Sequence, residues 1–172
     1  MPRYCSSCGS HVGRQASAAC PHCGAEHWPK MNAAAGALVV HDGKLLLLRR
    51  SIEPWLGAWC APGGFCDAGE DVAAAAIRET REEAALEIEL TGYLGQWVDV
   101  YTPGADDGDD PSYCCVSYFH AQVVGDPTPR LDDVEMDDWG WFGPDELPRP
   151  LAPAPGHGEE IYAAWARALA AG

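Results

Sequence analysis

One stretch of the chain, residues 63–86, constrains the fold more than any other, and its sequence is GGFCDAGEDVAAAAIRETREEAAL. Residues 71–84 within it are dense in good helix formers and include neither proline nor glycine, so they predict a helix. Glu79, Glu82 and Glu83 are three and four positions apart and therefore share one side of that helix. The other side is expected to be buried and consists of Val72, Ala73, Ala76, Ile77, Thr80 and Ala84.

Three carboxylates placed so closely repel one another and cost about 0.2–0.5 kcal/mol per pair on a helix surface. A hard divalent cation reverses the sign of that interaction, because carboxylate oxygens are preferred ligands of Mg²⁺ and Mn²⁺. Mg²⁺ in addition shares its coordination with substrate phosphates. The glutamates therefore indicate a metal site that faces a phosphate chain. The alternative interpretation is a solvated acidic helix face.

A longer pattern favours the metal site over the solvated face. Gly64 is followed by five residues and Glu70, and then by seven residues and the run Arg78-Glu79-Thr80-Arg81-Glu82-Glu83-Ala84-Ala85-Leu86. This spacing resembles the Nudix box, whose pattern is glycine, glutamate, arginine-glutamate and a glutamate pair at these intervals. All six of those positions match, namely Gly64, Glu70, Arg78, Glu79, Glu82 and Glu83.

Two positions depart from the family pattern. Thr80 replaces an aliphatic residue but keeps a β-branched shape, so little effect is expected. Ala85 replaces the second glycine of the box, at the point where the helix ends and a positive φ is often needed. Alanine there is expected to cost about 1 kcal/mol or to shift the exit of the helix.

The resemblance covers about residues 33–150 and implies an α/β fold, in which a mixed β-sheet lies between helices. It implies hydrolysis of the diphosphate link in a nucleoside diphosphate bonded to another group, with Mg²⁺ or Mn²⁺ as cofactor. The implied metal ligands are Glu79, Glu82, Glu83 and the carbonyl of Gly64. Arg78 and Glu70 are expected to orient the glutamates through charge-assisted hydrogen bonds.

The general base that removes a proton from the attacking water has two candidates. Glu82 is one, and Glu135 is the other, because it precedes the pair Trp141-Phe142 by six positions, as a glutamate does in many members of the family. Glu82, Glu83 and Glu135 are therefore the candidate catalytic carboxylates. The alternative for Glu135 is an acidic residue of a surface loop.

The first 30 residues contain two C-x-x-C motifs, Cys5 with Cys8 and Cys20 with Cys23. Four thiolates in this arrangement predict a closed tetrahedral Zn²⁺ site with a structural role. The alternatives are two disulfides or a redox motif. We therefore expect a zinc ribbon over residues 1–30 and a Nudix domain over residues 31–172.

Hydrophobic patterning outside the box predicts further elements. Residues 33–50 are two apolar runs joined by Asp42-Gly43, which indicates a hairpin. Residues 51–59 predict a loop, residues 86–101 one or two strands, residues 112–124 a strand, and residues 139–142 a short strand followed by a turn or a helical start. Residues 158–171 predict a terminal helix with Ile161, Trp165 and Leu169 on one face. That helix is expected to pack within the chain or against a second copy in a homodimer.

The net charge of the chain, −15, limits the kinds of partner that it can bind. Residues 1–30 carry three basic residues and one acidic residue, so the remainder carries −17. Such a body repels nucleic acids and anionic membranes. The chain has neither a long apolar run nor a signal-peptide pattern, so a cytoplasmic protein without membrane spans is expected. The aspartate-rich residues 103–111 lack the spacing of a calcium loop and predict a solvated surface loop.

The substrate is less constrained by the sequence. A zinc ribbon before a Nudix domain resembles the NADH pyrophosphatases, but their downstream motif Ser-Gln-Pro-Trp-Pro-Phe-Pro is missing here. An ADP-ribose-like compound is therefore expected first, a nucleoside triphosphate second and NADH third. Trp97, Tyr101 and Trp139 are candidates for stacking on the base, with burial in the core as the alternative. A non-catalytic ligand-sensing module whose ribbon binds a partner also stays open, although the intact box glutamates argue against it.

Overall fold

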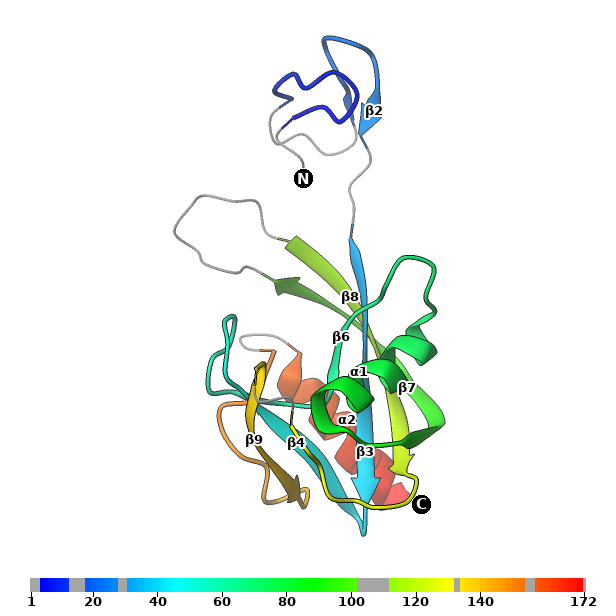
Figure 1. Ribbon diagram of the computed structural model, residues 1–172, viewed down its shortest axis with the longest axis vertical. Helices are drawn as coiled ribbons and strands as arrows, with labels where there is room; N and C mark the ends of the chain where they lie inside the picture. Colours follow the sequence, from blue (N-terminus) through cyan, green and yellow to red (C-terminus); the bar gives the residue numbers. More distant parts are fainter. Residues whose placement is uncertain are drawn as a thin grey trace.

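The computed structural model describes residues 4–12, 18–27, 31–101, 112–131, 134–153 and 157–171. The acidic segment 103–111 therefore lies outside the described residues. In the N-terminal part, β1 (Ala18–Ala19) and β2 (Glu26–His27) pair antiparallel to form a small two-stranded sheet. All the other strands belong to one larger sheet, and two helices accompany it (Figure 1).

The larger sheet has seven strands and is mixed. Its members are β3 (Asn32–His41), β4 (Lys44–Arg50), β5 (Trp59–Cys60), β6 (Gly63–Phe65), β7 (Ile88–Tyr101), β8 (Ser112–Val123) and β9 (Met136–Phe142). The order along the main path is β5-β4-β3-β8-β7, with β6 paired to β3 and β9 paired to β4. β3 and β8 run parallel, and the other pairs run antiparallel.

β3 and β4 form the hairpin that the sequence predicts. Asp42 and Gly43 link them with φ of 49° and 72°. Two successive residues with positive φ fit a type I′ turn, whose twist matches that of the flanking strands.

The strand residues alternate between two cores on opposite faces of the sheet. On one face the alanines of α1 (Val72–Ala84) pack against β3 and β4. On the other face α2 (Gly158–Ala171) packs against the alternate residues of the same strands, such as Leu38, Leu45 and Leu47. The sheet therefore lies between the two helices, as predicted, because the period of two sends successive side chains to opposite sides (Figure 1).

α1 is capped at both ends by residues whose conformations suit the task. The side chain of Asp71 accepts hydrogen bonds from the backbone N–H groups of Ala73 and Ala74, at 3.0 and 2.8 Å. At the other end Ala85 adopts the left-handed conformation, with φ 53° and ψ 30°, and its N–H donates to the carbonyl of Arg81. Alanine thus occupies the very conformation for which the family pattern uses glycine.

α2 packs within its own chain. Ile161, Tyr162 and Trp165 are fully buried, and the Tyr162 hydroxyl accepts from the N–H of Ala61 at 2.9 Å. Leu169, which the sequence predicts on the same face, lines a shallow hollow with Trp165 and residues of the sheet, and it is 42% exposed.

Two other boundaries differ from prediction. β9 begins at Met136, three residues before the predicted strand, because its pairing with β4 extends to Arg50. Among the described residues that follow it, 143–153, there are turns and no helix. Residues 88–101 form one strand whose register shifts beside Gly92 and Gly95.

None of the described helices has the length and apolar character needed to cross a membrane.

Candidate functional site

Arg78 is the centre of an ionic cluster at the site. Its guanidinium donates to both carboxylate oxygens of Glu70, at 2.9 and 2.8 Å. It also donates to Glu79 at 2.7 Å, to Glu82 at 2.9 Å and to the carbonyl of Phe65 at 2.9 Å. The hydrogen bonds from Arg78, together with one from the backbone N–H of Asp67, lower the pKa of Glu70 to about 2. The cluster joins the loop before α1, the helix and β6 into one charged unit.

The side chains of Glu79 and Glu82 are 15% and 59% exposed, and Glu83 is more deeply buried than either. It is only 5% exposed and lies with Thr80 and Ala84 on the buried side. Its carboxylate accepts the backbone N–H of Gly63 at 2.9 Å. Burial, together with the charges of Glu79 and Glu135, raises the pKa of Glu83 to about 8, although the hydrogen bond from Gly63 acts to lower it. A carboxylate held in this way is either neutral or compensated by a nearby cation.

The glycine pair of β6 lets the strand approach its neighbours closely. A Cβ atom at Gly64 would lie 2.6 Å from Oε2 of Glu79, and one at Gly63 would lie 2.4 Å from the carbonyl oxygen of Ala35 on β3. The first contact meets the flexible end of a side chain, whereas the second meets the backbone. The backbone at Gly64 is thus directly beside the carboxylate of Glu79.

A cavity of about 370 Å³ opens beside this cluster. One group of its lining residues is polar and consists of Gly63, Gly64, Asp67, Arg78, Glu79, Glu135 and Arg50. Another group comes mainly from β5, β7 and β8 and includes Cys60, Ala61, Asp99, Cys114, Val116 and Tyr118. Of the predicted site residues, Gly64, Arg78, Glu79 and Glu135 line the cavity, whereas Glu82 and Glu83 lie beside it on α1.

The cavity has aromatic neighbours that the sequence does not single out. Trp55 and Phe65 belong to its lining, and the guanidinium of Arg50 stacks 5.8 Å from the Trp55 ring centre. Trp97 and Trp139 are not among the lining residues. Trp97 packs edge-on against Tyr118, and Trp139 is paired with Leu48 across β9 and β4 and is 36% exposed. The side chain of Tyr101 lies outside the described residues.

The acidic residues fit a hard divalent cation in their chemistry. Burial raises the pKa of Glu79, and the charges of Glu82 and Glu135 raise it further, against the lowering effect of Arg78. Mutual repulsion of this kind is relieved by a divalent ion. Among the described residues, however, only the four cysteines bring three or more ligand atoms within 4.8 Å of one another. Arg78 instead bridges Glu79 and Glu82 in this arrangement.

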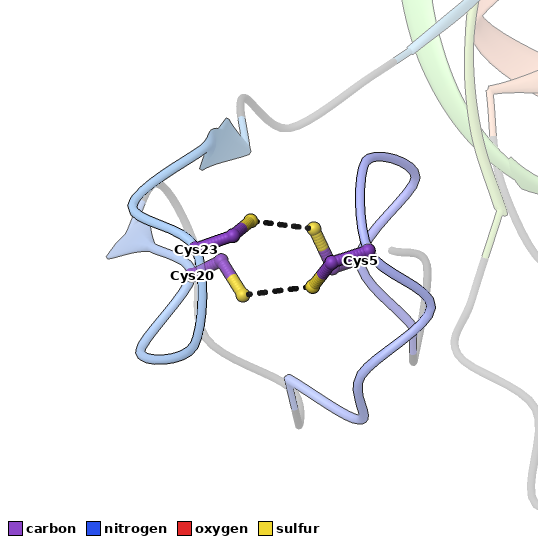
Figure 2. Close-up of side chains that lie close together, drawn as sticks. Cys5, Cys20 and Cys23 are labelled. Atoms are coloured by element: carbon purple, nitrogen blue, oxygen red, sulfur yellow. Dashed lines mark hydrogen bonds between the residues drawn. The ribbon is translucent and has the colours of Figure 1, made fainter.

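The four cysteines of the N-terminal part converge on one point (Figure 2). The sulfur atoms of Cys5 and Cys23 are 3.6 Å apart, and those of Cys8 and Cys20 are 3.7 Å apart. Disulfide sulfurs lie about 2.05 Å apart, so neither pair is bonded. Four sulfurs about 2.3 Å from a tetrahedral Zn²⁺ ion would be separated by about 3.8 Å, close to the two observed distances.

The two C-x-x-C turns have the same backbone design. In each turn the backbone N–H two residues after the first cysteine points to its sulfur at 3.4 Å, from Ser7 to Cys5 and from His22 to Cys20. Each turn also closes through a glycine N–H that donates to the carbonyl of the first cysteine at 2.8 Å. These glycines, Gly9 and Gly24, have φ of 71° and 75°. Such repeated geometry presents both sulfur pairs to a common centre.

Comparison with known proteins places this geometry in context. Residues 30–165 match the NUDIX domain. The NAD-capped RNA hydrolase NudC of Pseudomonas aeruginosa is 30% identical over 149 residues, which make up 85% of this chain and 49% of that protein. The ADP-ribose pyrophosphatase of Methanocaldococcus jannaschii is 30% identical over 116 residues, or 67% of this chain and 64% of that protein. The chain spans about half the length of the NudC proteins it matches.

Solved structures agree in fold. A MutT NUDIX hydrolase from Burkholderia pseudomallei superposes with a TM-score of 0.67 and 28% identity, over 79% of this chain and 98% of that chain. A NUDIX hydrolase from Nitrosomonas europaea superposes with a TM-score of 0.69 over 97% of this chain and 90% of that chain. At 24% identity the second match concerns the fold alone.

Proposed function

The chain belongs to the NUDIX family, and from this premise we propose that it is a Mg²⁺-dependent pyrophosphohydrolase. It would cleave the diphosphate link of a nucleoside diphosphate bonded to another group, with ADP-ribose-like compounds preferred. The observation that carries the proposal is the meeting of Gly64, Glu79 and Glu135 in one cavity, beside Glu83 and the Arg78 cluster.

The residues that would hold the cation are Glu79, Glu82, Glu83 and the carbonyl of Gly64. When bound, Mg²⁺ or Mn²⁺ lowers the pKa of a bound water and neutralises charge on the phosphate oxygens. The burial of Glu83 supports its place in this set, because a buried carboxylate is a strong ligand for an ion that removes its desolvation cost.

Arg78 and Glu70 are proposed as positioning residues. The two-pronged ion pair with Glu70 fixes the guanidinium, and the same guanidinium reaches Glu79 and Glu82. Arg78 would therefore hold the carboxylates of Glu79 and Glu82 in position for a cation.

Glu135 is the better placed of the two candidate bases. It lines the cavity, and its charge raises the pKa of both Glu79 and Glu83. Glu82 is not part of the lining, and Arg78 binds its carboxylate. We therefore expect Glu135→Gln to lower kcat strongly and to leave KM nearly unchanged. If Glu82 were the base, Glu82→Gln would show this effect and Glu135→Gln would not.

The substrate class rests on the relatives and on charge. An ADP-ribose pyrophosphatase and several NAD-capped RNA hydrolases are among the matching proteins, and ADP-ribose and NAD both contain an adenosine diphosphate joined to a second ribose. The net charge of −15 repels an RNA chain, which carries many phosphates, more strongly than a free nucleotide. NAD(H) is therefore the second candidate, supported by the NudC relatives, and a nucleoside triphosphate is the third. Base stacking by Trp97, Tyr101 and Trp139 stays a prediction.

The N-terminal cysteines are proposed to hold one structural Zn²⁺ ion. Cys5, Cys8, Cys20 and Cys23 would fill all four coordination positions of the ion and leave none for a substrate. The boundary between the ribbon, residues 1–30, and the Nudix domain, residues 31–172, stays a prediction. A homodimer also stays a prediction, and the apolar face of α2 does not require one, since its large side chains are buried within the chain.

The test is a substrate panel with the purified protein and Mg²⁺. ADP-ribose, NAD⁺, NADH, an NAD-capped RNA, a diadenosine polyphosphate, an NDP-sugar and nucleoside triphosphates are incubated separately, and the products are identified by mass. We expect AMP and ribose 5-phosphate from ADP-ribose, and no product when a chelator removes Mg²⁺. Binding of these compounds without cleavage of any would favour a ligand-sensing module instead.

A further inference from the structure

Asp99 is a charged residue at an unexpected position in the cavity. It lies on β7 opposite Cys114 of β8, and the two residues line the cavity together with Val116 and Tyr118. Asp99 is only 5% exposed. Acidic residues are seldom so deeply buried unless they are paired or bind a ligand.

The hydrogen bonds of Asp99 are incomplete. The backbone N–H of His157 donates to the Asp99 carboxyl group, and the thiol of Cys114 donates to the backbone carbonyl of Asp99 at 3.6 Å. The second carboxylate oxygen, Oδ2, is buried and has no hydrogen-bond partner within the part of the chain that the structure describes. Burial raises the pKa of Asp99, against a lowering effect of His157. A buried acceptor left without a donor calls for an explanation.

A metal ion does not provide that explanation. The cavity lining near Asp99 offers the thiols of Cys60 and Cys114, yet their sulfurs and the Asp99 carboxylate are not gathered within 4.8 Å of one another, as the four N-terminal cysteines are. A phosphate group does not provide it either, because the Asp99 carboxylate would repel it. The charged residues suited to phosphate and cation are Arg78 and Glu79, which line the same cavity.

We propose that Asp99 is a specificity-determining residue that accepts a hydrogen bond from a neutral N–H or O–H donor on the non-phosphate part of the substrate. The inference rests on the proposed function and deepens it. With the diphosphate beside Gly64 and Glu79, the nucleoside or the second ribose extends along the cavity towards Asp99 and Tyr118. The donor is either a ribose hydroxyl or an amino group of the base, since both provide the same hydrogen.

The first experiment uses the wild-type protein and ADP-ribose analogues that each lack one donor: the 6-amino group of the base, a hydroxyl of the adenosine ribose, or a hydroxyl of the second ribose. One deletion is expected to lower kcat/KM by about 10- to 100-fold, the effect of a lost hydrogen bond to a buried charged group. The deletion that has this effect identifies whether the donor belongs to the base or to a sugar.

The second experiment repeats the series with Asp99→Asn and Asp99→Leu. The leucine variant should process ADP-ribose and the sensitive analogue at equal rates, and the asparagine variant should discriminate less than wild type. Glu89→Gln, an exposed change on the same strand, serves as the matched control and should keep the full discrimination. A purely structural role for Asp99 would instead lower kcat/KM for all analogues by the same factor.

Binding measurements separate this inference from the proposed function. Calorimetry with α,β-methylene ADP-ribose and its donor-deleted analogues reports recognition even if the protein hydrolyses nothing, in which case only the proposed function fails. Equal affinities and equal kcat/KM across the wild-type analogue series would overturn the role of Asp99. So would a folded Asp99→Leu variant that still discriminates. If the leucine variant does not fold, the wild-type series decides alone.

Discussion

Replacing Ala85 by glycine should make the protein more stable. Ala85 is the residue that ends α1, and its φ of 53° and ψ of 30° put it in the left-handed region, where the Cβ atom of an L-residue comes close to the following carbonyl. Glycine lacks that atom. The side chain of Ala85 is exposed, so its removal takes little from the core. The capping bond from its N–H to the Arg81 carbonyl, 2.9 Å long, belongs to the backbone and remains.

The magnitude follows from two opposing contributions. Release from the left-handed conformation gains about 1–2 kcal/mol. The additional freedom of glycine in the unfolded chain costs about 0.4–1 kcal/mol. The net expectation for Ala85→Gly is a gain of about 0.5–1 kcal/mol, which for a chain of this size raises Tm by about 1–4 °C.

Chemical and thermal denaturation followed by circular dichroism measure this change. Ala74→Gly is the matched control, because Ala74 lies inside the same helix with ordinary helical geometry, and this variant should lose about 1 kcal/mol. An Ala85→Gly variant that is less stable than wild type, or that loses as much as Ala74→Gly, would refute the argument that the left-handed backbone is strained by alanine.

Three further predictions concern the site and the ribbon. Gly64→Ala should lower turnover by about 10²-fold or more while Tm stays near that of wild type, whereas Gly63→Ala should lower Tm, because its Cβ would meet backbone atoms. The ion pair of Glu70 with Arg78 should stabilise the protein above about pH 4.5, and this stabilisation should be lost as the pH falls towards about 2. In denaturation experiments Glu70→Gln should therefore be less stable than wild type at pH 7 and equally stable near pH 2. Cys23→Ser should abolish stoichiometric zinc in elemental analysis and lower the stability of the N-terminal part.

Opposite results would contradict each of these statements. Equal losses of Tm in Gly64→Ala and Gly63→Ala would mean that the two glycines have the same packing role. A stability difference between Glu70→Gln and wild type that persists unchanged to pH 2 would mean that the depressed pKa of Glu70 is not the source. Full zinc content in Cys23→Ser would remove the four-sulfur site.

The features that the sequence predicts best are those fixed by local spacing. The extent of α1 follows from its helix formers, and the left-handed exit at Ala85 follows from the glycine that the family pattern has there. The Asp42-Gly43 turn likewise fixes the β3–β4 hairpin. Cysteine spacing is equally local, and each C-x-x-C turn carries its own hydrogen bonds.

The burial of Glu83 is not predictable from helix periodicity. Glu79, Glu82 and Glu83 span about 100° around the helix axis, and periodicity does not say where along that arc the sheet begins. The position of β6 determines that Glu83 is buried, because the backbone N–H of Gly63, twenty positions earlier in the chain, donates a hydrogen bond to its carboxylate. A tertiary contact of this kind has no signature in the sequence of the helix.

The composition of the cavity is similarly a matter of tertiary structure. Trp97 and Trp139 are conspicuous in the sequence, but strand pairing directs one against Tyr118 and the other away from the lining. Trp55 and Phe65 line the cavity because the loop before β5 and the end of β6 meet there. The one available signal for Asp99 is a charged residue within the otherwise apolar run 97–101, and such a residue is more often exposed than buried in a binding site.

The most direct test of the proposed metal site compares Glu83→Gln with Glu89→Gln in ADP-ribose hydrolysis at saturating Mg²⁺, with AMP and ribose 5-phosphate measured by mass. Both variants exchange a glutamate for its amide, but Glu83 is buried beside the cavity and Glu89 is exposed on β7. We expect Glu89→Gln to match wild type and Glu83→Gln to lose about 10³-fold or more in kcat. A folded Glu83→Gln variant that hydrolyses ADP-ribose at the wild-type rate would contradict the account.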